Sequence, residues 1–593
     1  MCRIHGYLGG APVEQAALTA VAQAQRHGGP DAQTMHVGAG WALGSNRLAV
    51  QGVDHGRQPY RFGPGLMCVF NGEIYNHVAL RGQLAGDGFR FEGTCDGDVV
   101  LPLYERYGNE FVAHLEGMFA IAIVDSRRGE PILKLFNDHA GMKSLHYYVS
   151  GGRLCFASEL QALSRFPDFP TQLDRLAVDR YFGGKAVWGP ETIFSQVRTM
   201  PPGSIVEFGS DARLVETSFA MTTAPFTPDA DPAETLEGLL RAEMRKMLAA
   251  DVPVCAITSG GLDSSLLTAV ATELAGQVDT FNVAYRGEWP ADERHFAAQV
   301  AAHCGTRHHQ VELDPREFPA LIDEFVAHLD QPNNAPHSLS TFGLFKAVHE
   351  AGFKVAITGD GADELFAGYR RYLTAAADTR PGWHRRYQTT LAIAPVSVLA
   401  GLYSDAFRNE ILSGGGYFSD LVGDEVAADR DFGERGVLET LLHFDCVRRF
   451  PEYILRRLDN LSMAWAVEAR VPFLQPRIMA FASQLPARAK TAGGTGKAPV
   501  AAVARGRLPA CIVDRDKQPF TLPITAMMRP GQPLYDMVGD IVLPVERSGN
   551  LFNAVEVKSL FARQTARPAN QTAQLLWSIL ILERWLAVRG LQL

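Results

Sequence analysis

The sequence lacks the features that mark membrane proteins and nucleic-acid-binding proteins. No run of about 18 uninterrupted apolar residues occurs, so no membrane-spanning helix is expected. The net charge is −9, from 65 acidic and 56 basic residues among 593. Arginine clusters, such as those at 370–371, 385–386 and 456–457, are short and scattered. We therefore expect neither a nucleic-acid partner nor a membrane partner.

Cysteine patterns typical of zinc sites and disulfide scaffolds are also lacking. Eight cysteines stand at positions 2, 68, 95, 155, 255, 304, 446 and 511, none of them in a Cys-x-x-Cys pair. Several lie in apolar runs, which favours reduced, mostly buried thiols. The first residues contain no apolar core of a signal peptide. We therefore expect a cytoplasmic protein, and the 47% apolar and 20% charged content is typical of a globular chain with several domains.

A glycine- and serine-rich stretch, Ser259-Gly260-Gly261-Leu262-Asp263-Ser264-Ser265, is the first candidate site. It follows a short apolar run and precedes an apolar helix pattern. The two glycines let the backbone close on an anion, and free N–H groups at a helix start point toward it. Asp263 is a candidate ligand for a magnesium ion that bridges phosphate oxygens. No Gly-Lys-Ser/Thr follows, so this is not a Walker loop, and a serine-rich helix cap is the alternative.

The chain around this stretch alternates between short apolar strands and helical patterns. We expect strands at 254–258, 280–285, 309–313 and 354–358, and helices at 263–275, 292–304, 315–328 and 340–351. This alternation predicts a parallel sheet with crossover helices. Ligands of such sheets gather beyond the carboxyl ends of the strands, which is where Ser259 is expected.

A second stretch, Thr358 to Tyr369, occupies the corresponding position after the strand predicted at 354–358. It contains Gly359, Asp360 and Asp363. Asp363 is a candidate second magnesium ligand, and Asp360 a candidate contact for the amino group of an acceptor. An acidic turn that caps a helix is the alternative, since Gly-Asp-Gly alone is a weak signal. The position at the end of a second parallel strand favours a functional site.

Cys2 is the candidate nucleophile in the first part of the chain. Removal of Met1 would leave a cysteine whose thiol attacks and whose α-amine moves the proton. An ordinary thiol at a chain end is the alternative. Three polar stretches, 44–48, 69–76 and 93–98, offer the groups that an amino-acid substrate needs: a cation for its carboxylate, acids for its ammonium, and N–H donors for an oxyanion.

With these stretches, residues 1 to about 215 resemble the N-terminal-nucleophile glutaminase domain of class II glutamine amidotransferases. The resemblance implies an αββα fold with Cys2 as nucleophile. It further implies that Arg47 binds the glutamine carboxylate, that Glu73 and Asp96 hold its ammonium, and that Asn71 and Gly72 form the oxyanion hole. Arg3 departs from the usual glycine after the cysteine, and Gly28 from the arginine of the usual His-Arg-Gly-Pro-Asp segment.

Residues 234–593 resemble the ATP-pyrophosphatase synthetase domain of asparagine synthetases. The resemblance implies that Ser259–Ser265 is the pyrophosphate loop, that residues 358–369 are the second signature, and that Lys517 is the catalytic lysine. Lys497 and a closing helix near 575–586 also match. We therefore expect domains at 2–215 and 234–593, joined by a linker at 216–233 that contains the proline-rich stretch 222–232.

Together the two resemblances imply a glutamine-dependent, ATP- and Mg²⁺-dependent enzyme that adenylates a carboxylate and amidates it with ammonia, releasing AMP and pyrophosphate. Aspartate is the default acceptor. A peptide, sugar-acid or natural-product carboxylate is the alternative, because Gln331, Gln475 and Gln518 depart from the usual pattern in the acceptor half. A non-catalytic glutamine or nucleotide sensor is the third reading, and the intact Cys2, Asp263 and Asp363 argue against it. The oligomeric state is left open, with a homodimer as the candidate.

Overall fold

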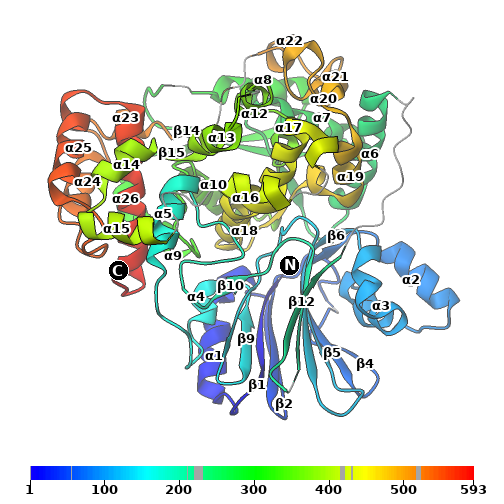
Figure 1. The fold of residues 1–593 in the computed structure, drawn as a ribbon. Coiled ribbons are helices and arrows are strands. Elements are labelled where there is room, and N and C mark those ends of the chain that lie inside the picture. Colours follow the sequence, from blue (N-terminus) through cyan, green and yellow to red (C-terminus); the bar gives the residue numbers. More distant parts are fainter. Residues whose placement is uncertain are drawn as a thin grey trace.

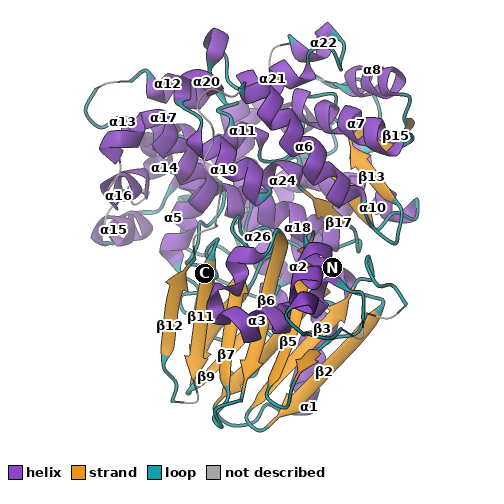
Figure 2. Ribbon diagram, turned by 90° about the vertical axis from the view of Figure 1, so that its right-hand side faces the viewer, coloured by secondary structure: helices purple, strands orange, loops and turns teal. Residues whose placement is uncertain are grey.

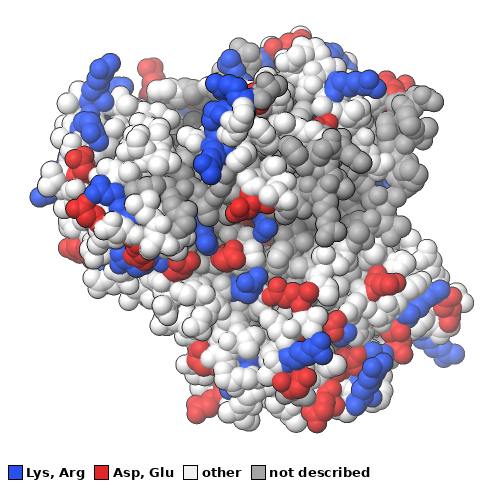
Figure 3. Space-filling view, in the orientation of Figure 1, with Lys and Arg blue, Asp and Glu red and all other residues white. Residues whose placement is uncertain are grey.

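The computed structural model describes residues 2–593 except 55, 92, 210, 220–230, 291, 379, 415–420, 429–431, 516, 517 and 519–521. Figure 1 shows a β-rich lower part built from the first residues of the chain and a larger helical part above it. No helix in the described part of the chain is long and apolar enough to cross a membrane. On the face in Figure 3, the basic and acidic residues that are coloured lie intermixed.

Two six-stranded antiparallel sheets form the lower part. The first has the order β10 (Arg198–Thr199), β8 (His146–Ser150), β9 (Arg153–Ala157), β1 (Cys2–Gly9), β3 (Trp41–Arg47) and β2 (Ala32–Gly38). The second has the order β12 (Leu214–Ser218), β11 (Ser204–Gly209), β7 (Ile132–Asn137), β6 (Gly117–Asp125), β5 (Leu66–Ile74) and β4 (Tyr60–Phe62). Ile4, Val69 and Ala120 belong to the apolar core between them.

Helices cover the outer face of each sheet (Figures 1 and 2). α1 (Gln15–Ala24) and α4 (Leu160–Leu163) lie on the first sheet, and α2 (His77–Gly86) and α3 (Val100–Tyr107) lie beside the second. This is the αββα arrangement predicted from the sequence, and it is confirmed. The last strand, β12, runs to Ser218, three residues beyond the predicted domain boundary at 215, and α6 begins at Pro232.

The upper part contains a five-stranded parallel sheet of order β15 (Arg307–Leu313), β14 (Asp279–Tyr285), β13 (Val254–Ile257), β16 (Val355–Ile357) and β17 (Glu468–Arg470). Its helices include α7 (Leu262–Ala275), α8 (Arg294–Cys304), α9 (Phe318–Ala327) and α10 (Ser338–Glu350). The predicted strands and helices are therefore confirmed to within a few residues. Strand β17 was not predicted, because a three-residue segment with two charged residues is not typical of a buried strand.

Helices make up the rest of the upper part. Before the last sheet strand come α5 (Arg175–Gly184), α6 (Pro232–Leu248), α11 (Ala362–Leu365), α12 (Arg370–Ala376), α13 (Trp383–Leu391), α14 (Val396–Leu402), α15 (Asp405–Ser413), α16 (Leu421–Ala428), α17 (Phe432–Phe444) and α18 (Arg456–Met463). After it come α19 (Pro476–Gln484), α20 (Ala487–Lys490), α21 (Ala498–Ala504), α22 (Ala510–Val513), α23 (Ile524–Met527), α24 (Tyr535–Val542), α25 (Ala554–Ala566) and α26 (Asn570–Val588). Two π-helical segments, Asp445–Arg449 and Pro451–Leu455, lead into α18.

The two parts share apolar cores rather than only a connecting chain. One core joins Tyr7 of β1 and Tyr181 of α5 to Trp577 and Trp585 of α26. A second joins Met118 of β6 to residues of the parallel-sheet part. We call the contact between residues 2–219 and residues 231–593 the seam. Because both cores cross it, the seam is a fixed part of the fold.

Two candidate active sites and the seam between them

Cys2 begins β1 and is 5% exposed. Its backbone nitrogen donates to Asn71 Oδ1 at 3.1 Å, and its sulfur accepts from Gln58 Nε2 at 3.1 Å. The Gln58 amide is itself fixed, because it also donates to the Phe70 carbonyl at 2.7 Å and accepts from the Phe70 N–H at 2.8 Å. Sequence reasoning did not find Gln58, because no local pattern marks it and its partners lie on other strands.

Burial raises the pKa of the Cys2 thiol above its usual value, although Arg47 acts in the opposite direction. A thiol in such an environment is mostly protonated at neutral pH and needs a base before it can attack. The candidate base is the α-amine that Cys2 would carry after removal of Met1.

Asn71 and Gly72 lie side by side on β5, next to Cys2. The Asn71 Nδ2 atom is buried and makes no hydrogen bond within the described residues, so this donor is available for a substrate oxygen. Gly72 has φ of +148°, and a Cβ at this position would lie 2.0 Å from the Met118 carbonyl oxygen. Only glycine fits there, which explains the Asn-Gly pair in physical terms.

The groups predicted to hold the ends of glutamine lie around Cys2. Arg47 pairs with Cys2 in the sheet register, and its Nη2 atom donates to the carbonyls of Gln51 at 2.9 Å and Gly52 at 2.8 Å. Asp96 accepts from the Ile74 N–H at 2.9 Å, which places it beside Glu73. Both carboxylates are buried.

Burial raises the pKa of Glu73 and of Asp96, the latter to about 6. Buried carboxylates gain most from a cation that arrives with the ligand, as an amino-acid ammonium does. The Arg470 guanidinium, from the other side of the seam, lies 3.7 Å from Glu73. The structure thus brings together Cys2, Arg47, the Asn71–Glu73 segment and Asp96.

The second site lies at the carboxyl ends of β13 and β16. The loop Ser259–Ser265 turns from β13 into α7, and hydroxyl groups hold its shape: Ser259 Oγ lies 3.0 Å from Ser264 Oγ and accepts from the Gly261 N–H at 3.2 Å. Gly260 has φ of +78°, and a Cβ there would lie 2.6 Å from the Ala297 nitrogen. The loop therefore requires glycine at this position and leaves the start of α7 facing the site.

The loop after β16 meets the first loop closely. A Cβ on Gly359 would lie 2.8 Å from the Ser264 nitrogen, so these two backbones touch. Asp263 and Asp363 converge on one point, which is marked by Lys497 Nζ at 2.5 Å from Asp263 Oδ2 and 2.7 Å from Asp363 Oδ1. Lys497 matched the resemblance, but no sequence pattern indicated that it lies between the two carboxylates.

Two carboxylates that converge on one cation fit a magnesium site. No group of three or more His, Cys, Asp or Glu side chains able to hold a metal occurs in the described part of the chain. Mg²⁺ tolerates so few protein ligands, since it keeps waters and phosphate oxygens in its shell. Asp263 and Asp363 would hold the ion, and the ion would supply positive charge to the phosphates of a bound nucleotide.

Asp360 lies half-buried on the second loop. Burial raises the pKa of its carboxyl, while the Arg457 guanidinium and Thr358 act to lower it. Arg457 belongs to α18 and contacts His337 Nε2 at 2.6 Å. Lys517, the predicted catalytic lysine, lies outside the described residues.

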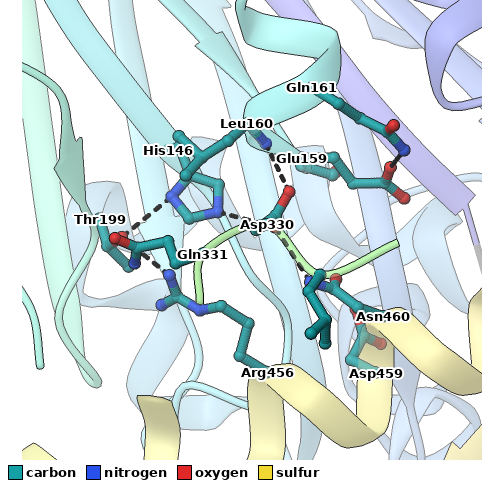
Figure 4. Close-up of polar contacts among 12 residues, drawn as sticks. His146, Glu159, Leu160, Gln161, Thr199, Asp330, Gln331, Arg456, Asp459 and Asn460 are labelled. Carbon is teal, nitrogen blue, oxygen red and sulfur yellow. Dashed lines mark hydrogen bonds and ion pairs between the residues drawn. The ribbon is translucent and has the colours of Figure 1, made fainter. Parts of the chain in front are cut away.

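Polar side chains from both sides meet at the seam (Figure 4). Asp330 accepts from the Leu160 N–H at 2.8 Å and from Asn460 Nδ2 at 3.1 Å, and it lies 3.2 Å from His146 Nε2. Arg456 donates to Thr199 Oγ1 at 3.0 Å. Helix α18 therefore reaches across the seam through Arg456, whereas Asn460 and Arg457 contact Asp330 and His337 of its own half.

Two of the three glutamines that depart from the usual pattern make hydrogen bonds to backbone groups within the protein. Gln331 accepts from the Ile193 N–H at 2.7 Å across the seam, and Gln475 is fully buried and donates to the Val471 carbonyl at 3.5 Å. Gln518 is exposed, and nothing in the structure explains it.

A glutaminase-type αββα half and a parallel sheet with a glycine-serine phosphate loop define a glutamine-dependent ligase built from two catalytic halves. The comparisons with known proteins agree with this class. The chain belongs to the asparagine synthase family, which matches residues 235–587, and residues 1–219 match the glutamine amidotransferase domain family. It is therefore a glutamine-dependent enzyme of this family, and the resemblance predicted from the sequence is confirmed.

Curated relatives match nearly the whole chain. A putative glutamine-hydrolysing asparagine synthetase of Mycobacterium tuberculosis is 30% identical over 96% of this chain and 94% of the relative. Asparagine synthetase 1 of Bacillus subtilis is 26% identical over 94% of this chain and 91% of the relative. The amidase chyE of Penicillium rubens is 28% identical over 78% of this chain and 77% of the relative. Relatives at this distance carry different names, so the family does not by itself define the acceptor.

Proposed function

We propose that the first half hydrolyses glutamine at Cys2. The observation that carries this proposal is the placement of Cys2 at the buried start of β1, with its backbone nitrogen 3.1 Å from Asn71 Oδ1. The thiol attacks the side-chain amide carbon of glutamine, and the α-amine takes its proton. Asn71 and Gly72 stabilise the oxyanion, ammonia leaves, and water then hydrolyses the thioester to glutamate.

Recognition of glutamine is assigned to charged groups on either side of the nucleophile. Arg47 would bind the substrate carboxylate, and the buried Glu73 and Asp96 would bind its ammonium. This division is supported by the positions of Arg47 beside Cys2 in the sheet and of Asp96 beside Glu73.

The second half would adenylate a carboxylate with ATP, so that AMP becomes the leaving group for ammonia. The loop Ser259–Ser265, with Thr358 and Gly359, would hold the pyrophosphate portion, and Lys517 would stabilise its negative charge. Asp263 and Asp363 would hold Mg²⁺, and Asp360 would contact the amino group of the acceptor. The convergence of Asp263 and Asp363 on Lys497 Nζ supports the shared cation position.

Ammonia would travel between the halves inside the molecule. A small hollow at the seam is lined by the apolar side chains of Met118, Met142, Leu455, Leu458, Ala469 and Val471 and by the charged side chains of Lys143 and Asp459. An apolar passage keeps ammonia unprotonated, because burial disfavours the charged form, and only the neutral form is a nucleophile.

Aspartate is the first acceptor to test, and amide formation on it would give asparagine. A specialised carboxylate is the second candidate, favoured by the amides Gln331 and Gln475 at positions where the family usually has acids, and by the amidase among the relatives. Pyrophosphate release with glutamine should be measured over a panel of carboxylates that includes aspartate. Stimulation by aspartate above all others supports the first candidate, and its absence removes it.

Cys2→Ala separates the two halves. This variant should lose glutamine hydrolysis but keep pyrophosphate release with ammonium salts, because the synthetase site is untouched. Loss of the ammonia-driven reaction as well would contradict the division of labour. No ATP turnover with any nitrogen donor would instead favour a glutamine or nucleotide sensor.

Removal of Met1 is part of this proposal, since only then does Cys2 carry an α-amine. Mass spectrometry of the purified chain should find Cys2 as the first residue. We further propose the domain division 2–215 and 234–593 with a linker at 216–233, a homodimer, and a cytoplasmic location, the last supported by eight free cysteines.

A further inference from the structure

Two departures from the usual glutaminase pattern lie against each other in the structure. A Cβ on Gly28 would lie 2.9 Å from both Cγ and Nε of Arg3. The family usually has a glycine at position 3 and an arginine at position 28, whereas this chain has Arg3 and Gly28. The stem and Nε of Arg3 thus occupy the space that a Cβ at position 28 would take.

Arg3 follows Cys2 directly but faces the other side of β1. Ile4 packs in the core between the two sheets, whereas Arg3 lies toward Glu159 and the 3₁₀ turn Arg26–Gly28 on the helix side. Successive side chains of a strand point to opposite faces. Because Cys2 and Arg3 are successive residues of β1, the Arg3 side chain points away from the face that carries Cys2, and Arg3 would act through the strand.

The Arg3 guanidinium joins acids from both halves of the molecule. Its Nε lies 2.7 Å from Glu159, and its Nη1 donates to Asp459 Oδ2 of α18 at 2.5 Å. Lys143 donates to the other oxygen of Asp459 at 2.6 Å. Two cations thus balance two acids in a buried cluster, and removal of one partner would leave an uncompensated charge.

Helix α18 connects this cluster to the synthetase site. Arg457 precedes Asp459 by two residues and acts on the pKa of Asp360, the proposed acceptor contact. The same short helix therefore carries Asp459, which contacts Arg3 of the first glutaminase strand, and Arg457, which contacts His337 Nε2 at 2.6 Å in the synthetase half.

We propose that Arg3 is a positioning residue for Cys2: it supplies the guanidinium missing at position 28 and ties the nucleophile strand to Asp459 across the seam. The proposal rests on the proposed role of Cys2 in glutamine hydrolysis. On this proposal, Arg3 compensates for the arginine that is absent at position 28. The geometry at Cys2 then depends on contact with the synthetase half.

The test is a double-mutant cycle in the full-length chain, with glutamate formation from glutamine as the assay. Arg3→Gly removes the guanidinium, and Gly28→Arg forces a second side chain against it. Each should lower kcat by about ten- to a hundredfold, as expected for a nucleophile displaced by a fraction of an ångström to 1 Å. KM should change little, because Arg47, Glu73 and Asp96 are untouched. The double variant Arg3→Gly/Gly28→Arg should recover most of the lost kcat, since residues in contact are not additive.

Further variants separate positioning from loss of folding. Asp459→Asn keeps the shape of the side chain but removes the acid between Arg3 and Lys143, so it should lower both kcat and the thermal midpoint, and Arg3→Lys should retain only part of the activity. Gly82→Arg, at an exposed glycine of α2 with nothing within 4 Å, is the matched control and should match the wild type. The rate at which a diazoketone analogue of glutamine labels Cys2 measures the nucleophile in the folded fraction alone.

The outcomes are distinguishable. Wild-type kcat and labelling rate in Arg3→Gly, or a double variant no better than its worse parent, would overturn the role of Arg3. Unchanged glutamine hydrolysis in Cys2→Ala would instead overturn the proposed nucleophile.

Discussion

Asp96 has an unusual environment for a carboxylate that binds an ammonium group. It is 5% exposed, and burial raises its pKa to about 6. The raised pKa means that Asp96 takes up a proton as the pH falls through about 6, where an ordinary aspartate stays charged. The charge that would hold the glutamine ammonium is then lost.

The KM for glutamine should therefore rise as the pH falls from 7 to 5. Below the pKa of Asp96, the KM should increase by at most about tenfold for each pH unit. Steady-state glutaminase assays over this range provide the measurement. Asp96→Asn should show a high KM with a weaker pH dependence in this window, because Glu73, whose pKa burial also raises, remains at the site. Asp98→Asn, at a nearby carboxylate paired with Arg81, is the control and should keep the wild-type profile. A KM that stays flat from pH 5 to 8 would remove Asp96 from the ammonium site.

At the residue scale, sequence reasoning located the groups that lie in contiguous motifs. Cys2 is recognisable from its position after Met1, and the Asn71–Glu73 segment and Asp96 from the short polar stretches that contain them; the structure brings these groups together. Gln58 and the role of Arg3 were not predictable, because their partners are far away in the chain. The Arg3–Asp459 contact spans 456 positions.

The two loops of the synthetase site form one unit because their backbones touch. Gly359 is the point of contact, where a Cβ would lie 2.8 Å from the Ser264 nitrogen. Any side chain at position 359 must push the second loop away from the start of α7. The N–H groups proposed to bind phosphate and the two carboxylates would then move apart.

Gly359→Ala should weaken binding of magnesium-ATP at least about tenfold, the cost of roughly 1.4 kcal/mol of lost interaction. Calorimetric titration of the intact protein measures this without knowledge of the acceptor. Glutamine hydrolysis should persist, because Cys2 lies in the other half. Gly238→Ala, on α6 with open space around it, is the matched control and should bind nucleotide normally. Wild-type affinity in Gly359→Ala would show that the contact is not required.

Elements with strong periodicity were predictable, and those shaped by tertiary contacts were not. The strands β13 to β16 and helices α7 to α10 agree with the sequence to within a few residues. Strand β17 is stable despite two charges because Arg470 pairs with Glu468 at 2.5 Å inside the protein. The π-helical turns before α18 carry Pro451 and had no sequence signal that we recognised.

The molecule as a whole should behave as one folding unit. Apolar cores cross the seam at two places, so neither half can unfold without exposing apolar surface of the other. Domains that share such cores lose the independence that linkers usually allow.

Calorimetric heating should therefore show a single unfolding transition rather than two. Addition of glutamine and of magnesium-ATP should each shift that one transition upward, since a ligand bound to either half stabilises the common folded state. Two resolved transitions, each shifted by only one ligand, would contradict a shared core.

The two halves of the molecule and their order were predictable from the sequence, but the way in which the halves pack against each other was not. Motif spacing indicated both halves and their order, and both are confirmed by the family matches. How the halves lie against each other depends on side chains such as Tyr7, Tyr181 and Trp585, which look like ordinary core residues in the sequence. Nothing local distinguishes an apolar residue at a seam from one inside a domain.

Lys497 places an ammonium group where a metal ion is proposed to bind, and this has a consequence for the order of events. Since the lysine already pairs with both Asp263 and Asp363 and cancels one of their two charges, the bare ion would have to displace it without any gain from phosphate. Magnesium that arrives with the nucleotide offers both an exchange partner for the carboxylates and an anion for the released ammonium group. The enzyme without nucleotide should thus not bind free magnesium, and it should bind the metal–nucleotide complex as a single ligand.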